Sequence, residues 1–184
     1  DYAAKYGTDG GTGLTNVDYA PLAEQMGRSL FAPLVFNCNA PDTGNMEVLL
    51  KYGTQAQRDE WLEPLLDGRI RSAFTMTEPD VASSDATNME ATAILDGDEV
   101  VVNGRKWFSS NASVADFLIV MAVTDPDAHK YQRASMLIVP TDTPGVDILR
   151  DIPTMEHPYE HYGRYGGHSE IAYTDVRVPA DALL

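Results

Sequence analysis

Hydrophobic residues change their spacing near residue 72 of this 184-residue chain. Before that point, apolar residues recur at the spacing of an amphipathic helix, three or four positions apart. Beyond it, β-branched runs alternate with turn dipeptides, as in chains built of short strands. The pattern predicts a helical part over residues 1–71 and a β-domain over residues 72–184.

Three short helices are predicted in the first part. Thr15 followed by Asp18 is typical of a helix start. A second helix is expected over about 45–52 with Gly53 as its left-handed cap, and a capping box over 54–57 opens the third. The residues expected to face inward are Val17, Leu22, Met26, Trp61, Leu62, Leu65 and Leu66. Such short helices bury little surface, so we expect only part of a helical bundle.

The second part reads as a series of strands. Asn103-Gly104 predicts a tight hairpin, because both central positions of that turn need positive φ. Strands are predicted over 89–95, 99–103, 105–109, 117–123, 134–140, 146–149 and 170–178, with polar loops over 124–133 and 151–168. The predicted fold class is α+β, a partial helical bundle followed by a small antiparallel β-barrel or orthogonal β-sandwich.

Charge and hydropathy exclude several classes of partner. The net charge of −15 disfavours nucleic acid and anionic membranes, which repel an acidic surface. A phosphate-bearing cofactor is still compatible, because backbone N–H groups bind phosphate locally. The longest apolar run, 117–123, is far shorter than the roughly 20 residues that a membrane span needs. No secretory leader is visible at the start of the sequence.

Cys38 is the single cysteine of the chain. It cannot form an internal disulfide, which favours a reducing compartment. No catalytic partner for the thiol is evident, and a buried, inert thiol is the preferred interpretation.

Candidate chemistry begins in the run 74–85, Phe-Thr-Met-Thr-Glu-Pro-Asp-Val-Ala-Ser-Ser-Asp. Small residues let the backbone approach a ligand, and successive N–H groups in a turn form a nest for anions. Phe74 and Met76 could supply an apolar wall, with Thr77 as a hydrogen-bonding partner beside it. These are the features that a flavin ring and its pyrophosphate require.

A second run, 103–111, has the sequence Asn-Gly-Arg-Lys-Trp-Phe-Ser-Ser-Asn. Aromatic rings followed by hydroxyls and an amide could pack against a flavin and hydrogen-bond to its edge. Taken alone, an aromatic-rich hairpin is more typical of a protein core.

The two runs together resemble the acyl-CoA dehydrogenases, which have Thr-Glu-Pro…Ser-Asp followed by Asn-Gly-x-Lys-x-Trp-Ile-Thr-Asn. Residues 41–68 are similar to the end of that family's N-terminal helical domain, and 170–179 to the last strand of its middle β-domain. The likeness extends over nearly the whole chain from about Gly13. It is greatest to acyl-CoA dehydrogenase family members 10 and 11.

The resemblance implies a set of ligand contacts. FAD would contact Phe74, Met76, Thr77, Ser83, Ser84, Phe108, Ser109 and Ser110, and acyl-CoA would contact Ser84 and Asp85. Thr77 would hydrogen-bond the isoalloxazine, Ser84 would lie near both pyrophosphate and CoA, and the 108–110 segment would pack on the ring and meet N5. Glu78 and Pro79 are expected to shape the loop.

This chain departs from the family pattern at two places: in the loop after Pro79, and at the aromatic residue that would pack on the flavin ring. The loop after Pro79 is one residue longer than the common form, and Asp80 and Ala82 stand where glycines are usual. Phe108 stands in place of a tryptophan. Both departures are consistent with the subgroup of members 10 and 11.

The resemblance also implies the reaction, FAD-dependent α,β-dehydrogenation of a fatty acyl-CoA thioester to the trans-2-enoyl-CoA. In this family the catalytic carboxylate lies in a C-terminal helical domain, which we expect to be absent from this chain. No catalytic residue is therefore assigned, and the segment alone is expected to be inactive. The resemblance implies a homodimer or homotetramer and an electron-transferring flavoprotein as partner. The compartment would be cytoplasmic in bacteria and mitochondrial or peroxisomal in eukaryotes.

Other readings stay open at this level. The same fold could serve as a non-catalytic module that binds CoA esters or a partner protein, and an acyl-CoA oxidase would share the flavin site. His157, His161 and His168, with Glu156 or Glu160, could suggest a metal site. We prefer a solvent-facing loop for this segment, since no second element closes the site, and predict no metal.

Overall fold

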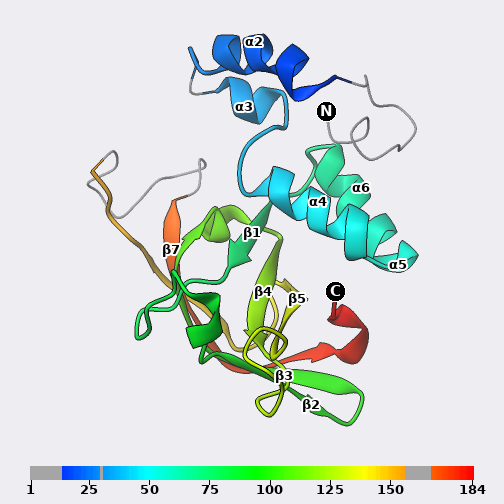
Figure 1. Cartoon of the computed structure of the whole chain (residues 1–184), viewed down its shortest axis with the longest axis vertical. Helices are drawn as coiled ribbons and strands as arrows, with labels where there is room; N and C mark the ends of the chain where they lie inside the picture. The colour runs from blue at the N-terminus through cyan, green and yellow to red at the C-terminus, as the bar shows by residue number, and fades with distance from the viewer. Residues whose placement is uncertain (1–13, 30, 156–166) are drawn as a thin grey trace.

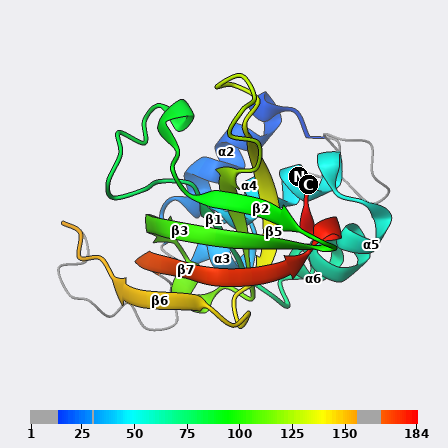
Figure 2. The same cartoon turned by 90° about the horizontal axis from the view of Figure 1, so that it is seen from below.

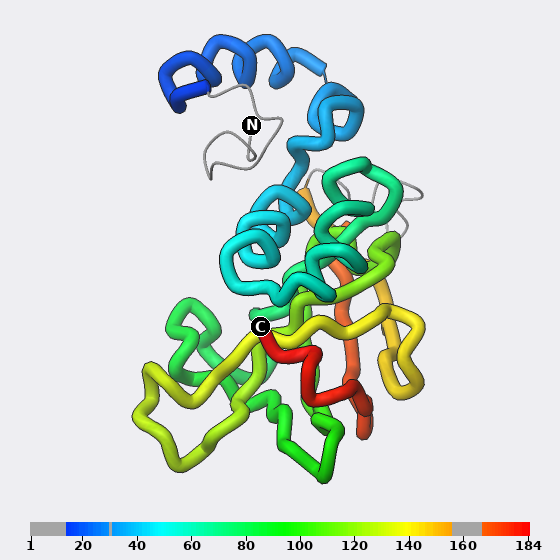
Figure 3. Tube along the Cα trace, turned by 90° about the vertical axis from the view of Figure 1, so that its right-hand side faces the viewer, coloured from blue at the N-terminus to red at the C-terminus, as the bar shows by residue number. Residues whose placement is uncertain are grey.

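Helices precede strands along the chain in the computed structural model, which describes residues 14–29, 31–155 and 167–184. The helices are α2 (Asn16–Met26), α3 (Ala32–Val35), α4 (Asp42–Tyr52), α5 (Gln55–Gln57), η1 (Arg58–Leu62) and α6 (Glu63–Leu66). Short helical turns η2 (Ala86–Asn88), η3 (Ala112–Val114) and η5 (Ala180–Ala182) interrupt or follow the strands. Helices α4 to α6 lie against the sheet, whereas α2 and α3 lie at the far end of the molecule (Figures 1 and 3).

Side-chain caps begin two of the helices, as the sequence predicts. Thr15 and Thr54 each form a capping box, at the start of α2 and α5 respectively. The predicted left-handed cap at Gly53 is wrong, because this residue is extended, with φ −64° and ψ 143°. The backbone of α4 then runs directly into the α5 cap, which explains why no left-handed turn forms there.

The predicted inward faces of the helices are only partly correct. Leu62 and Leu65 are buried, but Leu66 is exposed. No residue of α2 is buried, and Val17 is 81% exposed. Helix α2 forms because its residues satisfy local caps and spacing, while none of its apolar side chains is buried in the described part of the chain.

The strands form one curled, mixed sheet (Figure 2). They are β1 (Ser72–Thr75), β2 (Thr92–Asp96), β3 (Glu99–Ser110), β4 (Phe117–Val123), β5 (Ala134–Pro140), β6 (Val146–Asp151) and β7 (His168–Pro179). Their order is β1-β4-β2-β3-β7-β6, and β5 pairs with β4. The α+β fold class is confirmed. The sheet is not wholly antiparallel, since β1 and β2 both run parallel to β4.

Two apolar layers cover the two faces of β4. One lies inside the curled sheet, around Leu118, Val120 and Val139. The other lies between the sheet and α4 to α6, where Trp61 contacts Phe117 at a ring-centroid distance of 5.0 Å. The nearly continuous apolar sequence of β4 follows from this burial on both faces. None of the described helices is both long and apolar enough to cross a membrane.

The predicted hairpin at Asn103-Gly104 is wrong, because β3 continues straight through these residues. The chain reverses earlier, at Gly97, where φ is +70° and Asp96 pairs with Glu99. Gly104 has φ +148°, and a Cβ added there would lie 2.5 Å from the Cβ of Ala91. A glycine is required at this position because the β3 backbone lies close to Ala91, and not because the chain turns here.

Replacing Gly104 with alanine should lower the free energy of unfolding by about 2–4 kcal/mol, from the overpacking against Ala91 and the strained φ. Gly44 is the matched control, because it lies exposed in α4 with no atom within 4 Å of an added Cβ. Gly44→Ala should raise stability by about 0.5–1 kcal/mol. Urea denaturation of both variants measures the difference, and equal stabilities would contradict the proposed close approach.

Candidate functional site

A β-bulge interrupts β3 within the second sequence run. Lys106 pairs with Ile171 and Ser109 with Ser169, so β3 has one residue more than β7 in this interval. Phe108 lies in this interval with φ 50° and is 45% exposed. A bulge of this kind redirects side chains at the edge of a site, and here it presents an aromatic ring to the exterior.

The segment between β1 and β2, loop 76–91, lies alongside this part of β3. The Trp107 N–H donates to the Thr77 carbonyl at 3.0 Å, and Lys106 Nζ donates to the Met76 carbonyl at 2.9 Å. The two runs that the sequence singled out are therefore neighbours in space.

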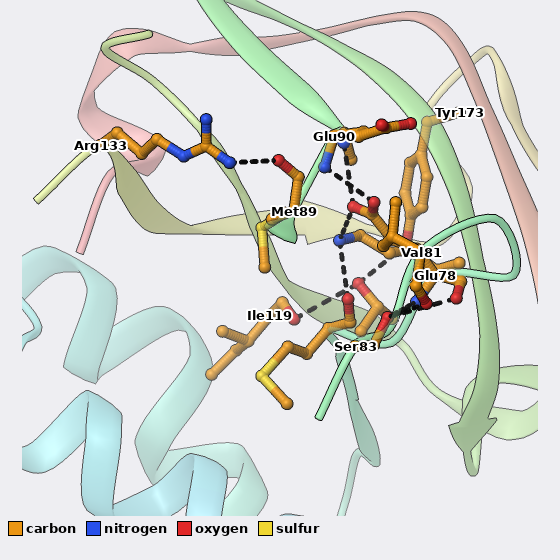
Figure 4. Close-up of polar contacts among 12 residues, drawn as sticks. Glu78, Val81, Ser83, Met89, Glu90, Ile119, Arg133 and Tyr173 are labelled. Carbon is orange, nitrogen blue, oxygen red and sulfur yellow. Dashed lines mark hydrogen bonds and ion pairs between the residues drawn. The ribbon is translucent and has the colours of Figure 1, made fainter. Parts of the chain in front are cut away.

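A buried ion pair joins the loop to the strand. Lys106 Nζ lies 2.8 Å from Glu78 Oε1, and both side chains are almost completely buried. Burial lowers the pKa of Lys106, and the hydrogen bond that Lys106 donates to Glu78 opposes that shift. The Glu78 carboxylate also accepts the N–H groups of Glu90 at 2.8 Å and Ala91 at 2.9 Å (Figure 4).

Two further contacts hold loop 76–91 in shape. Ser83 Oγ accepts the Glu78 N–H at 2.8 Å. Arg133 donates to the carbonyl of Thr87 at 2.6 Å and to the carbonyl of Met89 at 3.0 Å, which Figure 4 shows. The loop is thus fixed at its two ends and on its outer side, although most of its tip is exposed.

The predicted loop residues divide by their contacts. Asp85 is the N-cap of η2, and the hydrogen bonds from Thr87 lower the pKa of its carboxyl. Ser83 is hydrogen-bonded within the loop, whereas Ser84 is exposed. Of the two serines, Ser84 is therefore the more exposed.

The predicted apolar wall lies at the end of β1. Phe74 is partly buried against the helical layer, and Met76 and Thr77 are partly buried where the chain leaves the strand. The neighbouring Thr75 is fully buried and its Oγ1 accepts a hydrogen bond from the Tyr173 hydroxyl at 3.1 Å. Side chains alternate along β1, so Thr75 is fully buried, whereas Phe74 and Met76 on either side of it are only partly buried.

The three predicted residues Phe108, Ser109 and Ser110, in and just after the bulge, have different surroundings. Ser109 is buried, and its Oγ has no hydrogen-bond partner within residues 14–29, 31–155 and 167–184. Ser110 Oγ lies 2.9 Å from His168 Nδ1, and the His168 ring lies 6.4 Å from that of Phe108. A buried hydroxyl without a partner calls for an explanation, and Ser109 Oγ shares this feature with Thr141 Oγ1 at the turn after β5.

Sequence reasoning missed Lys106 and misplaced His168. Lys106 shares the inward face of β3 with Val100 and Val102, so strand periodicity could have indicated a buried lysine in need of an acid. His168, at the end of the predicted loop 151–168 and one of the metal-ligand candidates, is the first residue of β7.

No three His, Cys, Asp or Glu side chains gather into a metal-binding group within the part of the chain that the structure describes. His157, His161, Glu156 and Glu160 lie outside the described residues. The structure therefore does not test that set of candidate ligands.

Two protein-family models match the chain. Residues 4–69 match the acyl-CoA dehydrogenase N-terminal domain, and residues 73–161 match the acyl-CoA dehydrogenase middle domain. "Probable acyl-CoA dehydrogenase FadE2" of Mycobacterium tuberculosis is 56% identical over 176 residues, 94% of this chain and 42% of the relative. Acyl-CoA dehydrogenase family member 11 of Gallus gallus is 52% identical over 93% of this chain and 22% of the relative.

Solved structures agree with these matches. A "putative acyl-CoA dehydrogenase" from Mycobacterium abscessus superposes with a TM-score of 0.88 at 61% identity, covering 95% of this chain and 42% of that one. A glutaryl-CoA dehydrogenase from Mycobacterium smegmatis, solved in complex with FADH2, has a TM-score of 0.72 at 30% identity, over 97% and 42% of the two chains. The chain thus spans less than half the length of these relatives. It belongs to the acyl-CoA dehydrogenase family.

Proposed function

We propose that the full-length protein containing this chain oxidises a fatty acyl-CoA thioester to the trans-2-enoyl-CoA with FAD as its cofactor. In this proposal residues 1–71 belong to the N-terminal helical domain, and residues 72–184 form the middle β-domain that supplies the flavin and CoA platform. The observation that supports it most is the contact of the two sequence runs, through the Trp107 N–H and the Thr77 carbonyl, in a chain of this family.

The residues present fit a flavin with a pyrophosphate. Phe108 supplies an exposed aromatic face, and Met76 and Thr77 lie partly exposed at the adjoining strand end. The Ser109 hydroxyl has no hydrogen-bond partner in the described structure and could bond to the cofactor edge. The related M. smegmatis enzyme was solved with FADH2, which supports the same cofactor here.

We assign each group one task. When bound, FAD would accept a hydride from the β-carbon of the thioester. Phe74, Met76 and Phe108 would exclude water from the ring, and Thr77, Ser109 and Ser110 would orient its polar edge. Ser83 and Ser84 would face the pyrophosphate, and Ser84 and Asp85 the CoA. These tasks follow the family resemblance, and Ser84, Asp85 and Phe108 are exposed, whereas Ser109 is buried.

The catalytic base is proposed to lie outside this chain, in a C-terminal helical domain. Each buried carboxylate in the described ranges already has cationic partners. Asp42 contacts Arg71, Glu78 contacts Lys106, and Glu170 contacts Arg105 and Arg150. For Glu170 this pairing makes the carboxylate a weak base, because Arg150 and Arg105 stabilise its charged form. The pKa of Glu170 is accordingly lowered, mainly by Arg150.

The remaining assignments concern the assembled protein. We propose a homodimer or homotetramer that passes its electrons to an electron-transferring flavoprotein. By the same resemblance, the protein would be cytoplasmic in a bacterium and mitochondrial or peroxisomal in a eukaryote.

The test of this function is product formation by the full-length protein. Incubation with a series of saturated fatty acyl-CoA thioesters and an electron acceptor should yield an enoyl-CoA lighter by two hydrogen atoms, detected by mass spectrometry. CoA-ester binding without any change in mass would instead favour the non-catalytic module.

Replacing Ser109 with alanine should separate cofactor binding from folding. Losing one neutral hydrogen bond, about 1 kcal/mol, should weaken FAD binding about 5-fold. Stability without cofactor should change by less than about 0.5 kcal/mol, because no partner in the described structure loses a bond.

Thr141→Val is the matched control, since Thr141 Oγ1 is likewise buried without a partner in the described ranges. It lies at the turn after β5, where its N–H donates to the Asp116 carbonyl at 3.0 Å. FAD titration of both variants by fluorescence decides the question, and equal affinities would remove Ser109 from the site.

A further inference from the structure

The Glu78 side chain closes loop 76–91 at its base. Its carboxylate accepts N–H groups from Glu90 and Ala91, at 2.8 and 2.9 Å. One side chain thus joins the point where the chain leaves β1 to the point where it enters β2 (Figure 4). The loop tip, with Ser84, extends from this closed base.

Lys106 fixes the closed base to the sheet. Its ammonium group donates to the Met76 carbonyl and to Glu78 Oε1, so it contacts both the backbone and the carboxylate of the loop. Two residues earlier, Gly104 leaves the space that Ala91 occupies against β3. The lysine and the glycine of one strand therefore act on the same loop end.

Stability alone is a poor explanation for this arrangement. Apolar side chains of similar volume often stabilise a core as well as a buried ion pair, because both charges lose their hydration. Apolar residues would, however, leave the N–H groups of Glu90 and Ala91 without an acceptor. What the ion pair adds is a fixed position for loop 76–91 relative to β3.

We propose that Glu78 and Lys106 are positioning residues, which hold loop 76–91 so that Thr77 and Ser84 face the flavin and the CoA ester. This inference rests on the proposed function. Neither residue needs to contact a ligand, since each acts through the backbone of the loop.

The test uses three variants of the full-length protein, Glu78→Gln, Lys106→Met and the double variant. Each single variant leaves one buried charge without its partner and should lower the Tm. The double variant removes both charges and should recover most of that loss. In Glu78 the two N–H groups are accepted by different carboxylate oxygens, so in glutamine one of them faces an NH2 group and loses its acceptor.

Two readouts then distinguish positioning from stability. Hydrogen exchange at the Glu90 and Ala91 amides should be faster in all three variants, including the double variant with its recovered Tm. The kcat/KM of the double variant should still be about 100-fold below wild type, because a displaced loop misaligns the substrate.

Glu170→Gln is the matched control, since Glu170 is an equally buried, paired carboxylate whose partners are on β3 and β6. It should lower the Tm without changing exchange at the two loop amides. Exchange at wild-type rates in the double variant would overturn the proposal. Faster exchange combined with unchanged FAD affinity and unchanged kcat/KM would show that the loop can loosen without affecting the site. That result would overturn the positioning role.

Failure of the proposed function would give a different result. A wild-type full-length protein that holds no flavin and makes no enoyl-CoA would contradict the dehydrogenase assignment. Hydrogen exchange in the same variants needs neither cofactor nor turnover, so it would still show whether Glu78 and Lys106 hold the loop.

Discussion

Replacing Lys106 with methionine should lower the free energy of unfolding by about 3–5 kcal/mol, as expected for a buried ion pair that loses one partner. The Glu78 carboxylate would remain buried with only the two loop N–H groups to stabilise it. Methionine fills much of the volume, so the loss reports charge and hydrogen bonding more than a cavity.

Urea denaturation at neutral pH measures this change. Lys51→Met is the control, because Lys51 is exposed at the end of α4 and its substitution should alter stability by less than about 0.5 kcal/mol. A Lys106→Met variant within about 1 kcal/mol of wild type would show that the pair contributes little to the fold.

The 184-residue chain on its own should not convert acyl-CoA to enoyl-CoA. Loss of a general base alone slows proton transfer by about 10²–10⁴-fold, and the buried carboxylates described here already have cationic partners. Mass spectrometry of CoA esters, with the full-length protein as the positive control, measures the difference.

Turnover by the isolated chain within about 10-fold of the full-length rate would contradict this prediction. It would place the base among the acids of this sequence. Glu156 and Glu160, which lie outside the described residues, would then be the first to replace.

Much of the architecture could be predicted from local patterns. Capping boxes at Thr15 and Thr54 fix two helix starts, because the cap and its partner are three residues apart in sequence. The apolar runs of β4 and β5 predict buried strands by composition alone. The association of the two sequence runs followed from the family resemblance, and the structure places them in contact.

What the sequence did not reveal depends on contacts between distant residues. Asn103-Gly104 has the signature of a hairpin, but the glycine is required by Ala91, thirteen positions away and on another segment. Strand periodicity could have indicated that Lys106 is buried, but not that its partner is Glu78, 28 positions away in sequence. Val17 is expected to face inward but is exposed, because helical periodicity predicts an apolar face without showing which segment covers it.

The flavin assignment is tested most directly by the visible absorption spectrum of the full-length protein, recorded anaerobically before and after a fatty acyl-CoA is added. Oxidised flavin should be bound, and its absorbance should fall as the acyl-CoA reduces it. A colourless protein that stays colourless when supplied with FAD, or a bound flavin that no acyl-CoA reduces, would rule out the dehydrogenase assignment.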